Sequence, residues 1–261
     1  MTFKSPGIVG AGVMGEALLA SLIRSGFSAD SIAVLEKRED RLSQVRSKYQ
    51  IGNSKIEDSD VVLLATKPQD LGETLSSLKL GKNTLLISLL AGVKSAKIES
   101  LTSDSVRVVR VMPNTPLLIS KGMSVIAKGS RASKSDIDWV CDFFGKSGKV
   151  LVMKEQEMDA VTATSGSGPA YLFAFVEAMT KAAIRLGLDQ DSANTLVSQT
   201  LFGAAGMLES SGKDAKTLRE NVTSPKGTTA AALQVFEDSK LDEIVYEAMK
   251  AARDRSIELS N

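Results

Sequence analysis

A glycine-rich turn near the start of the chain constrains its fold more than any other feature. Gly10–Gly15 has the spacing GxGxxG, follows the short apolar stretch Gly7–Val9, and leads into a helical pattern over Glu16–Arg24. In a strand–turn–helix unit the first glycine permits the tight turn, the second lets the backbone approach a pyrophosphate, and the third lets the helix pack closely. Free N–H groups at the helix start then face the anion. We expect a dinucleotide-binding turn, although this spacing alone also occurs by chance and in sites for other nucleotide-like ligands.

Apolar strand patterns and helical patterns alternate over the first part of the chain. The expected strands after the first are Ile32–Leu35, Val61–Ala65, Leu85–Leu89, Val106–Val111, Met123–Ala127 and Val150–Val152. This alternation predicts an α/β fold with a Rossmann-type, doubly wound sheet. Ligands of such sheets bind beyond the carboxyl ends of the strands, where Thr66–Pro68, Leu90-Ala91 and Met112–Pro116 follow. The last of these segments is equally consistent with a rigid, proline-stiffened turn.

The strand pattern stops near Lys154, and the rest of the chain has helical patterns. The expected helices are Ala170–Leu186, Asp189–Leu208, Lys216–Asn221, Ala230–Asp238 and Leu241–Leu259. The first of them is apolar nearly all round, so it must be buried on several sides, most simply against a second subunit. We therefore expect two domains: a dinucleotide-binding domain over residues 1–154 and an all-helical dimerisation and substrate-binding domain over 155–261.

Composition excludes several kinds of chemistry. The chain of 261 residues has no histidine and one cysteine, Cys141, so histidine-based catalysis, a disulfide and a histidine or thiolate metal site are not expected. The formal net charge of +1 gives no electrostatic footprint for nucleic acid or an anionic membrane. There is neither a membrane-spanning apolar run nor a signal-peptide pattern, so we expect a cytoplasmic protein.

Charged residues follow the second expected strand at the position where the adenosine ribose of a dinucleotide should lie. Glu36 could accept hydrogen bonds from both ribose hydroxyls, which favours NAD, whereas Lys37 and Arg38 could pair with a 2′-phosphate, which favours NADP. The alternative is a solvated, charged helix start over Glu36–Arg41. The residues leave the choice of coenzyme open.

A polar turn, Thr223–Thr229, precedes one of the expected helices. The hydroxyls of Ser224, Thr228 and Thr229, with the free N–H groups of the helix start, are suited to a small carboxylate. Threonine also caps helices routinely with the same groups. From the residues alone, anion binding and capping are about equally favoured.

The chain as a whole resembles pyrroline-5-carboxylate reductases. The resemblance runs in family order through Gly10–Gly15, Ala65–Pro68, Val111–Pro116, Ser165–Tyr171, Leu218-Arg219, Asn221–Pro225, Gly227–Thr229 and Arg255–Leu259. It implies a cofactor domain followed by a helical domain that interlocks with a second subunit, with the substrate between nicotinamide and helical domain at the dimer interface. A homodimer is implied, and some members of the family form decamers.

The resemblance also implies site residues. Cofactor contacts transfer to Val9, Gly10, Ala11, Gly12, Val13, Met14, Ala65, Thr66, Lys67, Pro68, Leu89, Leu90, Ala91, Asn53 and Asn221, in addition to Glu36, Lys37 and Arg38 at the ribose position. Asn53 needs a one-residue gap to align. The substrate carboxylate site transfers to Ser224, Gly227 and Thr228, and Thr229 matches the threonine that hydrogen-bonds the ring nitrogen.

The implied reaction is hydride transfer from NADPH, or from NADH as the alternative, to the C=N carbon of 1-pyrroline-5-carboxylate, giving L-proline in the last step of proline biosynthesis. Such an NAD(P)H-dependent oxidoreductase needs no histidine, because the cofactor carries the difficult chemistry. Thr229 is the candidate catalytic residue, orienting the ring nitrogen or relaying its proton.

Two positions depart from the family pattern. Lys226 stands where the family usually has a glycine, and a lysine there is strained if the position needs a positive φ. It either strengthens anion binding or narrows the substrate range. The charges of Glu36–Arg38 replace the family's usual small or polar residues, which leaves the preference for NADP open.

Two rival functions are weaker. A β-hydroxyacid dehydrogenase also joins a Rossmann domain to helices, but it needs a catalytic lysine where this chain has Leu172. A non-catalytic NAD(P)H sensor would lack residues of the substrate site. Lys226 is the one residue of that site that favours the sensor function.

Overall fold

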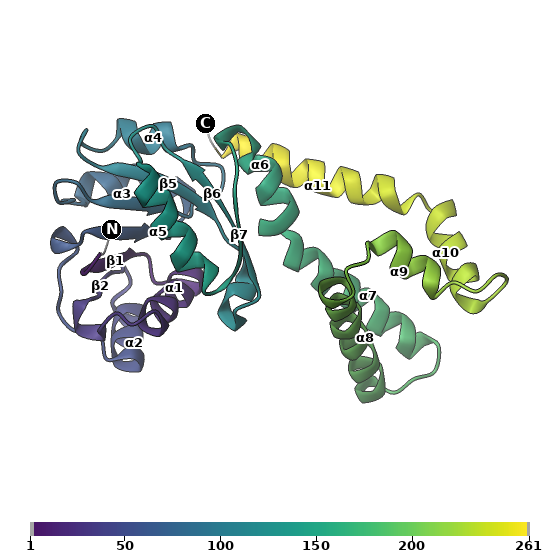
Figure 1. The fold of residues 1–261 in the computed structure, drawn as a ribbon. Coiled ribbons are helices and arrows are strands. Elements are labelled where there is room, and N and C mark those ends of the chain that lie inside the picture. The colour runs from purple at the N-terminus through teal and green to yellow at the C-terminus, as the bar shows by residue number, and fades with distance from the viewer. Residues whose placement is uncertain (1–2, 260–261) are drawn as a thin grey trace. The chain divides into compact units, whose positions relative to one another are not determined.

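The structure is a computed structural model that describes residues 3–259, and a seven-stranded sheet in the order β2-β1-β3-β4-β5-β6-β7 forms its first part (Figure 1). Neighbouring strands are parallel except β5 and β6, which are antiparallel. The strands are β1 (Pro6–Val9), β2 (Ala33–Leu35), β3 (Val61–Leu64), β4 (Leu85–Ser88), β5 (Arg107–Met112), β6 (Gly122–Lys128) and β7 (Gly148–Val152). The predicted fold class, a mostly parallel α/β sheet followed by helices, is confirmed. The predicted domain ends at residues 1–2 and 260–261 lie outside the described residues.

Six helices accompany the sheet within the described residues. They are α1 (Val13–Arg24), α2 (Glu39–Tyr49), α3 (Leu71–Ser77), α4 (Ser95–Ser100), α5 (Lys134–Gly145) and α6 (Met158–Val161). The start of α2 was foreseen only as the alternative of a charged helix start over Glu36–Arg41, because Val45 is its one fully buried residue and charged side chains hide its periodicity. The glycine-rich turn lies between β1 and α1, as its spacing predicts.

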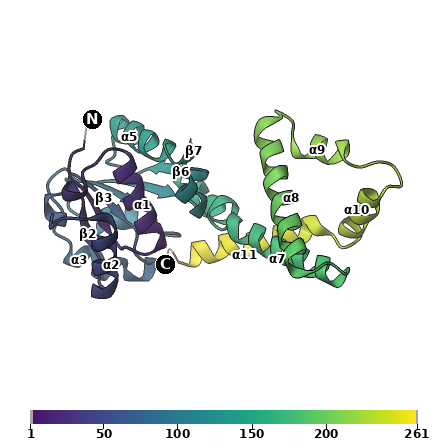
Figure 2. The same cartoon turned by 90° about the horizontal axis from the view of Figure 1, so that it is seen from below.

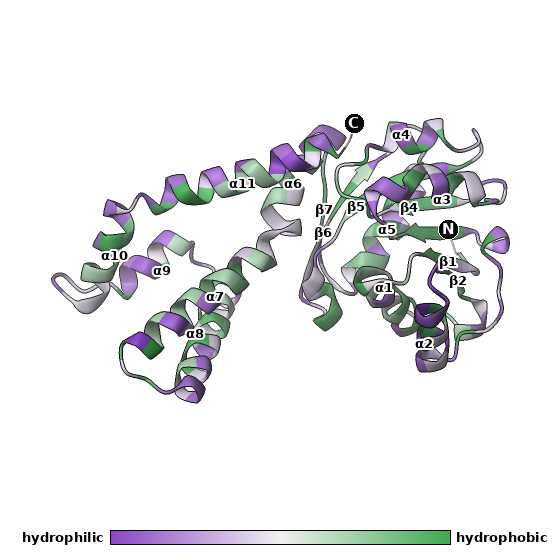
Figure 3. Ribbon diagram, turned by 180° about the vertical axis from the view of Figure 1, so that it is seen from behind, coloured by the Kyte–Doolittle hydropathy of each residue, from purple (hydrophilic) through white to green (hydrophobic). Residues whose placement is uncertain are grey.

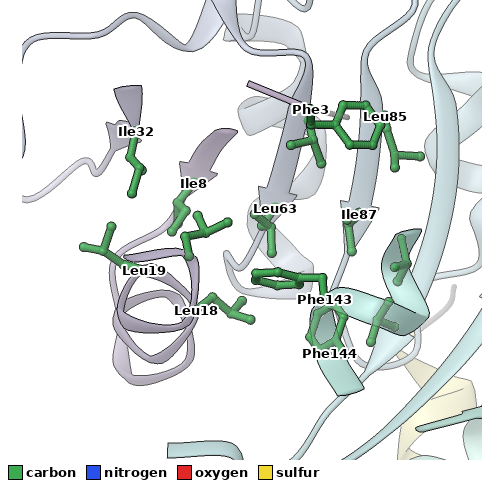
Figure 4. Packing of buried hydrophobic residues seen from close by; sticks show 14 of the residues in the cluster. Phe3, Ile8, Leu18, Leu19, Ile32, Leu63, Leu85, Ile87, Phe143 and Phe144 are labelled. Atoms are coloured by element: carbon green, nitrogen blue, oxygen red, sulfur yellow. The ribbon is translucent and has the colours of Figure 1, made fainter. Parts of the chain in front are cut away.

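Alternate side chains of each central strand enter two different hydrophobic clusters. Ile8 of β1 belongs to the cluster that contains Leu18 of α1 and Phe143 of α5 (Figure 4). Its neighbour Val9 belongs to the other cluster, together with Leu71 of α3. Helices α1 and α5 therefore cover one face of the sheet, and α3 covers the other. A strand buried on both faces needs a continuous apolar run, as this sequence has.

The chain divides into two compact units, one containing the residues up to Ser167 together with those from Ala251 onward, and the other Gly168–Lys250. Polar contacts tie residues beyond 154 to the sheet unit. Buried Arg110 of β5 pairs with Glu155 at 2.9 Å, and Ser256 Oγ donates to Asp159 Oδ1 at 2.7 Å. The compact unit that contains the sheet therefore extends past residue 154. The domain boundary at residue 154, which rests on the sequence pattern, stays a prediction.

The second unit is helical throughout its described elements. It contains α7 (Gly168–Arg185), α8 (Gln190–Ser210), α9 (Ala215–Asn221), α10 (Thr228–Asp238) and most of α11 (Leu241–Glu258) (Figure 2). Hydrophobic residues recur along these helices (Figure 3). Many are exposed in the single chain, including Phe173 at 62%, Leu186 at 86% and Phe202 at 76%. An apolar surface of this kind marks an interaction face.

Candidate functional site

The three motif glycines each meet a different steric demand. Gly10 has a φ of +92°, and a Cβ there would lie 2.8 Å from the carbonyl oxygen of Ala65. A Cβ on Gly15 would overlap the carbonyl oxygen of Gly10, so this glycine permits close packing of α1. A Cβ on Gly12 would meet nothing within 4 Å. The turn is therefore closed against the protein at Gly10 and Gly15 and open at Gly12, as a backbone cradle for a pyrophosphate should be.

A cavity of about 480 Å³ opens beside this turn. It lies where β1 and β3 are neighbours although they are not consecutive in the chain, which is the topological switch point at which such sheets bind ligands. Predicted cofactor residues that line it are Val9, Gly10, Gly12, Glu36, Lys37, Arg38, Ala65, Thr66 and Lys67. The structure thus brings together residues from the ends of three strands.

Other lining residues were not predicted from the sequence. They are Leu35, Arg41, Asp70, Thr74 and Ser77. Asp70, Thr74 and Ser77 have the spacing i, i+4, i+7 that places residues on one face of a helix, and this polar stripe is the signal that could have identified them.

The remaining predicted cofactor residues do not line the cavity. They are Ala11, Val13, Met14, Asn53, Pro68, Leu89, Leu90, Ala91 and Asn221. Val13 is 69% exposed at the start of α1. Asn53 is exposed between α2 and β3. Leu90 is buried and donates its backbone N–H to Ser88 Oγ at 3.4 Å. Asn221 ends α9 in the second unit. Their roles stay predictions.

Buried polar atoms test whether this cavity fits a dinucleotide. The hydroxyl oxygens of Thr66 and Thr74 are inaccessible to solvent and have no hydrogen-bond partner in the protein. Both residues line the cavity. A buried hydroxyl without a partner is costly and needs an explanation, and a bound polar ligand is one. Together with the open cradle at Gly12, these hydroxyls fit a dinucleotide.

Arg41 fastens the glycine-rich turn. Its Nε donates to the backbone oxygen of Ala11 at 2.8 Å, and its guanidinium also pairs with Glu16. Lys48 and Tyr49 donate to the same carboxylate at 2.7 and 3.1 Å. Hydrogen bonds from Lys48, then Arg41 and Tyr49, lower the pKa of Glu16 to about 2. This cluster locks α2 to the start of α1 and sets the shape of the turn.

The polar turn of the second unit is not a side-chain cap. The N-cap of α10 is Gly227, and no side chain caps the helix. Thr223 Oγ1 donates to the backbone oxygen of Arg219 at 2.6 Å. Within residues 3–259, no protein hydrogen bond is found for the hydroxyls of Ser224, Thr228 or Thr229. They lie beside the unsatisfied first N–H groups of α10, so both sets of groups are available to an anion.

Lys226 has a φ of +59°, so the strain foreseen for a lysine at a glycine position is present. The residue is exposed. Its positive charge lies in the chain between Ser224 and Gly227, two of the predicted carboxylate ligands.

The Met112–Pro116 segment is more than a rigid turn. Asn114 is 9% exposed. Its Nδ2 donates to the backbone oxygen of Ser165 at 3.1 Å, and its Oδ1 accepts the N–H of Met123 at 2.9 Å. It fastens the end of β5 to β6 and to the π-helical turn Thr162–Gly166.

No cluster of three or more His, Cys, Asp or Glu side chains in the described part of the chain could hold a metal ion. None of the helices between residues 3 and 259 combines the length and apolarity that a membrane crossing requires.

The sheet topology, the open glycine turn and the cavity at the switch point define a dinucleotide-binding protein of the kind found among NAD(P)-dependent oxidoreductases. Sequence comparison agrees: residues 6–92 match the profile described as "NADP oxidoreductase coenzyme F420-dependent", and residues 155–259 match that described as "Pyrroline-5-carboxylate reductase dimerisation".

Known proteins resemble the chain over its whole length. A pyrroline-5-carboxylate reductase from Corynebacterium melassecola is 39% identical over 262 residues, which cover 97% of both chains. The solved structure of the Coxiella burnetii pyrroline-5-carboxylate reductase is 32% identical, with a TM-score of 0.86 over 100% of both chains. That of Plasmodium falciparum pyrroline carboxylate reductase with NADP bound is 28% identical, with a TM-score of 0.84 over 98% of both. The chain belongs to the pyrroline-5-carboxylate reductase family.

Proposed function

We propose that this protein reduces 1-pyrroline-5-carboxylate to L-proline with NADPH, the last step of proline biosynthesis. The observation that carries the proposal is the uncapped start of α10, where hydroxyls and backbone N–H groups are left available to a carboxylate. The same chain holds a cavity built for a dinucleotide. Family membership supplies the identity of the substrate.

The cavity residues hold the adenosine half of the coenzyme. The backbone at Gly10 and Gly12 receives the pyrophosphate, and the buried hydroxyl of Thr66 gains its missing partner there. The further cofactor contacts, Leu89–Ala91, Asn53 and Asn221, are part of this proposal. When bound, the nicotinamide supplies the hydride that reduces the C=N carbon.

The polar turn holds the substrate. Ser224 and Thr228 donate their hydroxyl protons to the carboxylate, and the backbone N–H groups near Gly227 complete the anion site. Thr229 donates to the lone pair of the neutral ring nitrogen, or relays to it the one proton that the reduction consumes together with the hydride. Protonation of this nitrogen makes the C=N carbon electrophilic, so no stronger acid is needed.

The assembly is a homodimer formed through the exposed apolar faces of α7–α11. Residues 155–261 form the dimerisation domain in this proposal, and 1–154 the coenzyme domain. The decamer that some members of the family form is the higher assembly to test for, and the protein acts in the cytoplasm in this proposal. Light scattering coupled to size exclusion tests the assembly directly: a monomer would refute the dimer, and a lone dimer would refute the decamer.

The activity is tested by following the absorbance of NADPH after addition of 1-pyrroline-5-carboxylate, with proline quantified in the same reaction. We expect one proline formed for each NADPH oxidised. A matched reaction with a β-hydroxyacid in place of the imine, run with NADP⁺, should give no reduction of the coenzyme. Coenzyme binding without turnover would favour the sensor function instead.

A further inference from the structure

Glu36 presents a fixed negative charge to the cavity. It follows β2 directly and lines the cavity wall. Its Oε2 accepts the backbone N–H of Ala11 at 2.7 Å, and its Oε1 accepts that of Arg38 at 3.1 Å. Both donors are neutral, and no ion pair to Glu36 is found within the described residues. The carboxylate is therefore held in one orientation, and the cation Arg38 interacts with it electrostatically but forms its ion pair with Asp40 instead.

The geometry leaves acceptor capacity on this carboxylate. A carboxylate offers about four lone-pair positions, and the two backbone donors use two of them. The vicinal hydroxyls of an unphosphorylated ribose are two donors of matching type. A 2′-phosphate carries a charge of about −1.5 to −2 at neutral pH and would be repelled by the same group.

The cations that follow Glu36 in the chain, Lys37 and Arg38, form exposed ion pairs that are easily broken. Lys37 Nζ lies 2.8 Å from Glu73, and Arg38 Nη2 lies 2.6 Å from Asp40. All four side chains are more than half exposed, and such pairs contribute little to stability. Lys37 and Arg38 can therefore leave their partners for a phosphate. Arg41 cannot, because it is fastened to Ala11 and Glu16.

We propose that Glu36 is a specificity-determining residue that lets this enzyme take NADH alongside NADPH, with Lys37 and Arg38 receiving the 2′-phosphate of NADPH. The assignment rests on the proposed function and deepens it by dividing the ribose site into two parts. Glu36 receives the hydroxyls of NADH. The Lys37-Arg38 pair offsets the repulsion that Glu36 exerts on the phosphate of NADPH.

The test is calorimetric binding of NAD⁺ and NADP⁺, and of their fragments 5′-AMP and 2′,5′-ADP, to the full-length protein. Wild type should bind both dinucleotides. Glu36→Gln keeps an acceptor for the Ala11 N–H but removes the charge, and should weaken NAD⁺ and 5′-AMP about tenfold while tightening NADP⁺ and 2′,5′-ADP. Arg38→Ala should weaken only NADP⁺ and 2′,5′-ADP, the two ligands that carry a 2′-phosphate, and leave NAD⁺ and 5′-AMP unchanged.

Glu39→Gln is the matched control. It removes the same charge three residues along the chain, from an exposed residue that does not line the cavity. Its discrimination between the dinucleotides should equal that of wild type. If Glu36→Gln left the ratio of the NAD⁺ and NADP⁺ affinities unchanged, or if Glu39→Gln changed that ratio equally, the assignment of Glu36 would be overturned while the proposed function would stand. Wild-type protein that binds neither dinucleotide would overturn both the assignment and the proposed function.

Discussion

Replacing Lys226 by glycine should separate the cost of a strained backbone from the benefit of a charge. A non-glycine residue in the left-handed region costs about 1–2 kcal/mol, and Lys226 adopts it at φ +59°. Glycine removes this strain but loses about 0.5–1 kcal/mol more backbone entropy on folding. The variant should therefore unfold with a free energy about 0–1.5 kcal/mol larger than wild type. Loss of an exposed charge beside the substrate carboxylate, worth up to about 1 kcal/mol, should raise KM for 1-pyrroline-5-carboxylate up to about fivefold.

Lys240→Gly is the control for this change. Lys240 is also an exposed lysine with a positive φ, +54°, but it follows the other end of α10. Urea unfolding of both variants measures the effect of the strained backbone on stability, and steady-state kinetics at low and high salt measure the effect of the charge on KM. Both variants should gain similar stability, and only Lys226→Gly should raise KM. The difference in KM between Lys226→Gly and wild type should shrink at high salt, because salt screens the charge of Lys226. An unchanged KM in Lys226→Gly, or an equal rise in Lys240→Gly, would refute the reasoning.

Three further changes test separate parts of the account. Thr229→Ala should lower kcat about tenfold or more while leaving the Kd for NADP⁺ unchanged, and Thr229→Ser should restore most of the rate; wild-type turnover in the alanine variant would remove Thr229 from the mechanism. Gly12→Ala should weaken NADP⁺ binding with little loss of stability, because its Cβ meets only open space. Gly15→Ala should destabilise the fold, because its Cβ would overlap a backbone oxygen. Equal behaviour of the two variants in thermal unfolding and binding calorimetry would contradict this. Glu16→Gln should lower the free energy of unfolding by about 1 kcal/mol at pH 7, after allowance for solvent screening. Because the folded-state pKa of Glu16 is lowered from 4.5 to about 2, this contribution is fully present above the ordinary carboxyl pKa and is lost as pH falls from there to the folded-state pKa. A wild-type–variant difference that stayed constant down to about pH 2 would contradict it.

The fold was predictable where apolar burial follows a simple period. Runs such as Val61–Ala65 and Leu85–Leu89 are typical of strands covered on both faces, and β3 and β4 lie there. The sequence pattern indicated α2 only as an alternative, a charged helix start over Glu36–Arg41, because the helix buries mainly Val45 and exposes charged side chains to solvent. The packing of residues beyond 154 onto the sheet was not predicted. It depends on the pair Arg110–Glu155, whose members are 45 residues apart, and on Met158 and Val161, which cluster with Val125 and Ala127 of β6. Contacts between residues so far apart in the chain leave no local pattern.

The candidate site was predictable where backbone shape determines the residue. Gly10 and Gly15 follow from steric demands that only glycine meets, and the turn lies after β1, where the motif predicts it. Arg41 was missed because its role depends on α2, an element without an apolar signal. Whether Thr228 and Thr229 cap α10 or stay available to a ligand was undecidable from residue types, since both uses need the same hydroxyl. The backbone resolves it by placing Gly227 at the N-cap.

The most direct test of the central claim is the fate of the hydride. Incubate the protein with 1-pyrroline-5-carboxylate and each of the two C4-deuterated epimers of NADPH, and analyse the proline by mass spectrometry and NMR. The account predicts that one epimer delivers a single deuterium to the carbon that carried the C=N bond, and that the other delivers none. Proline without deuterium from either epimer, or no proline at all, would contradict it.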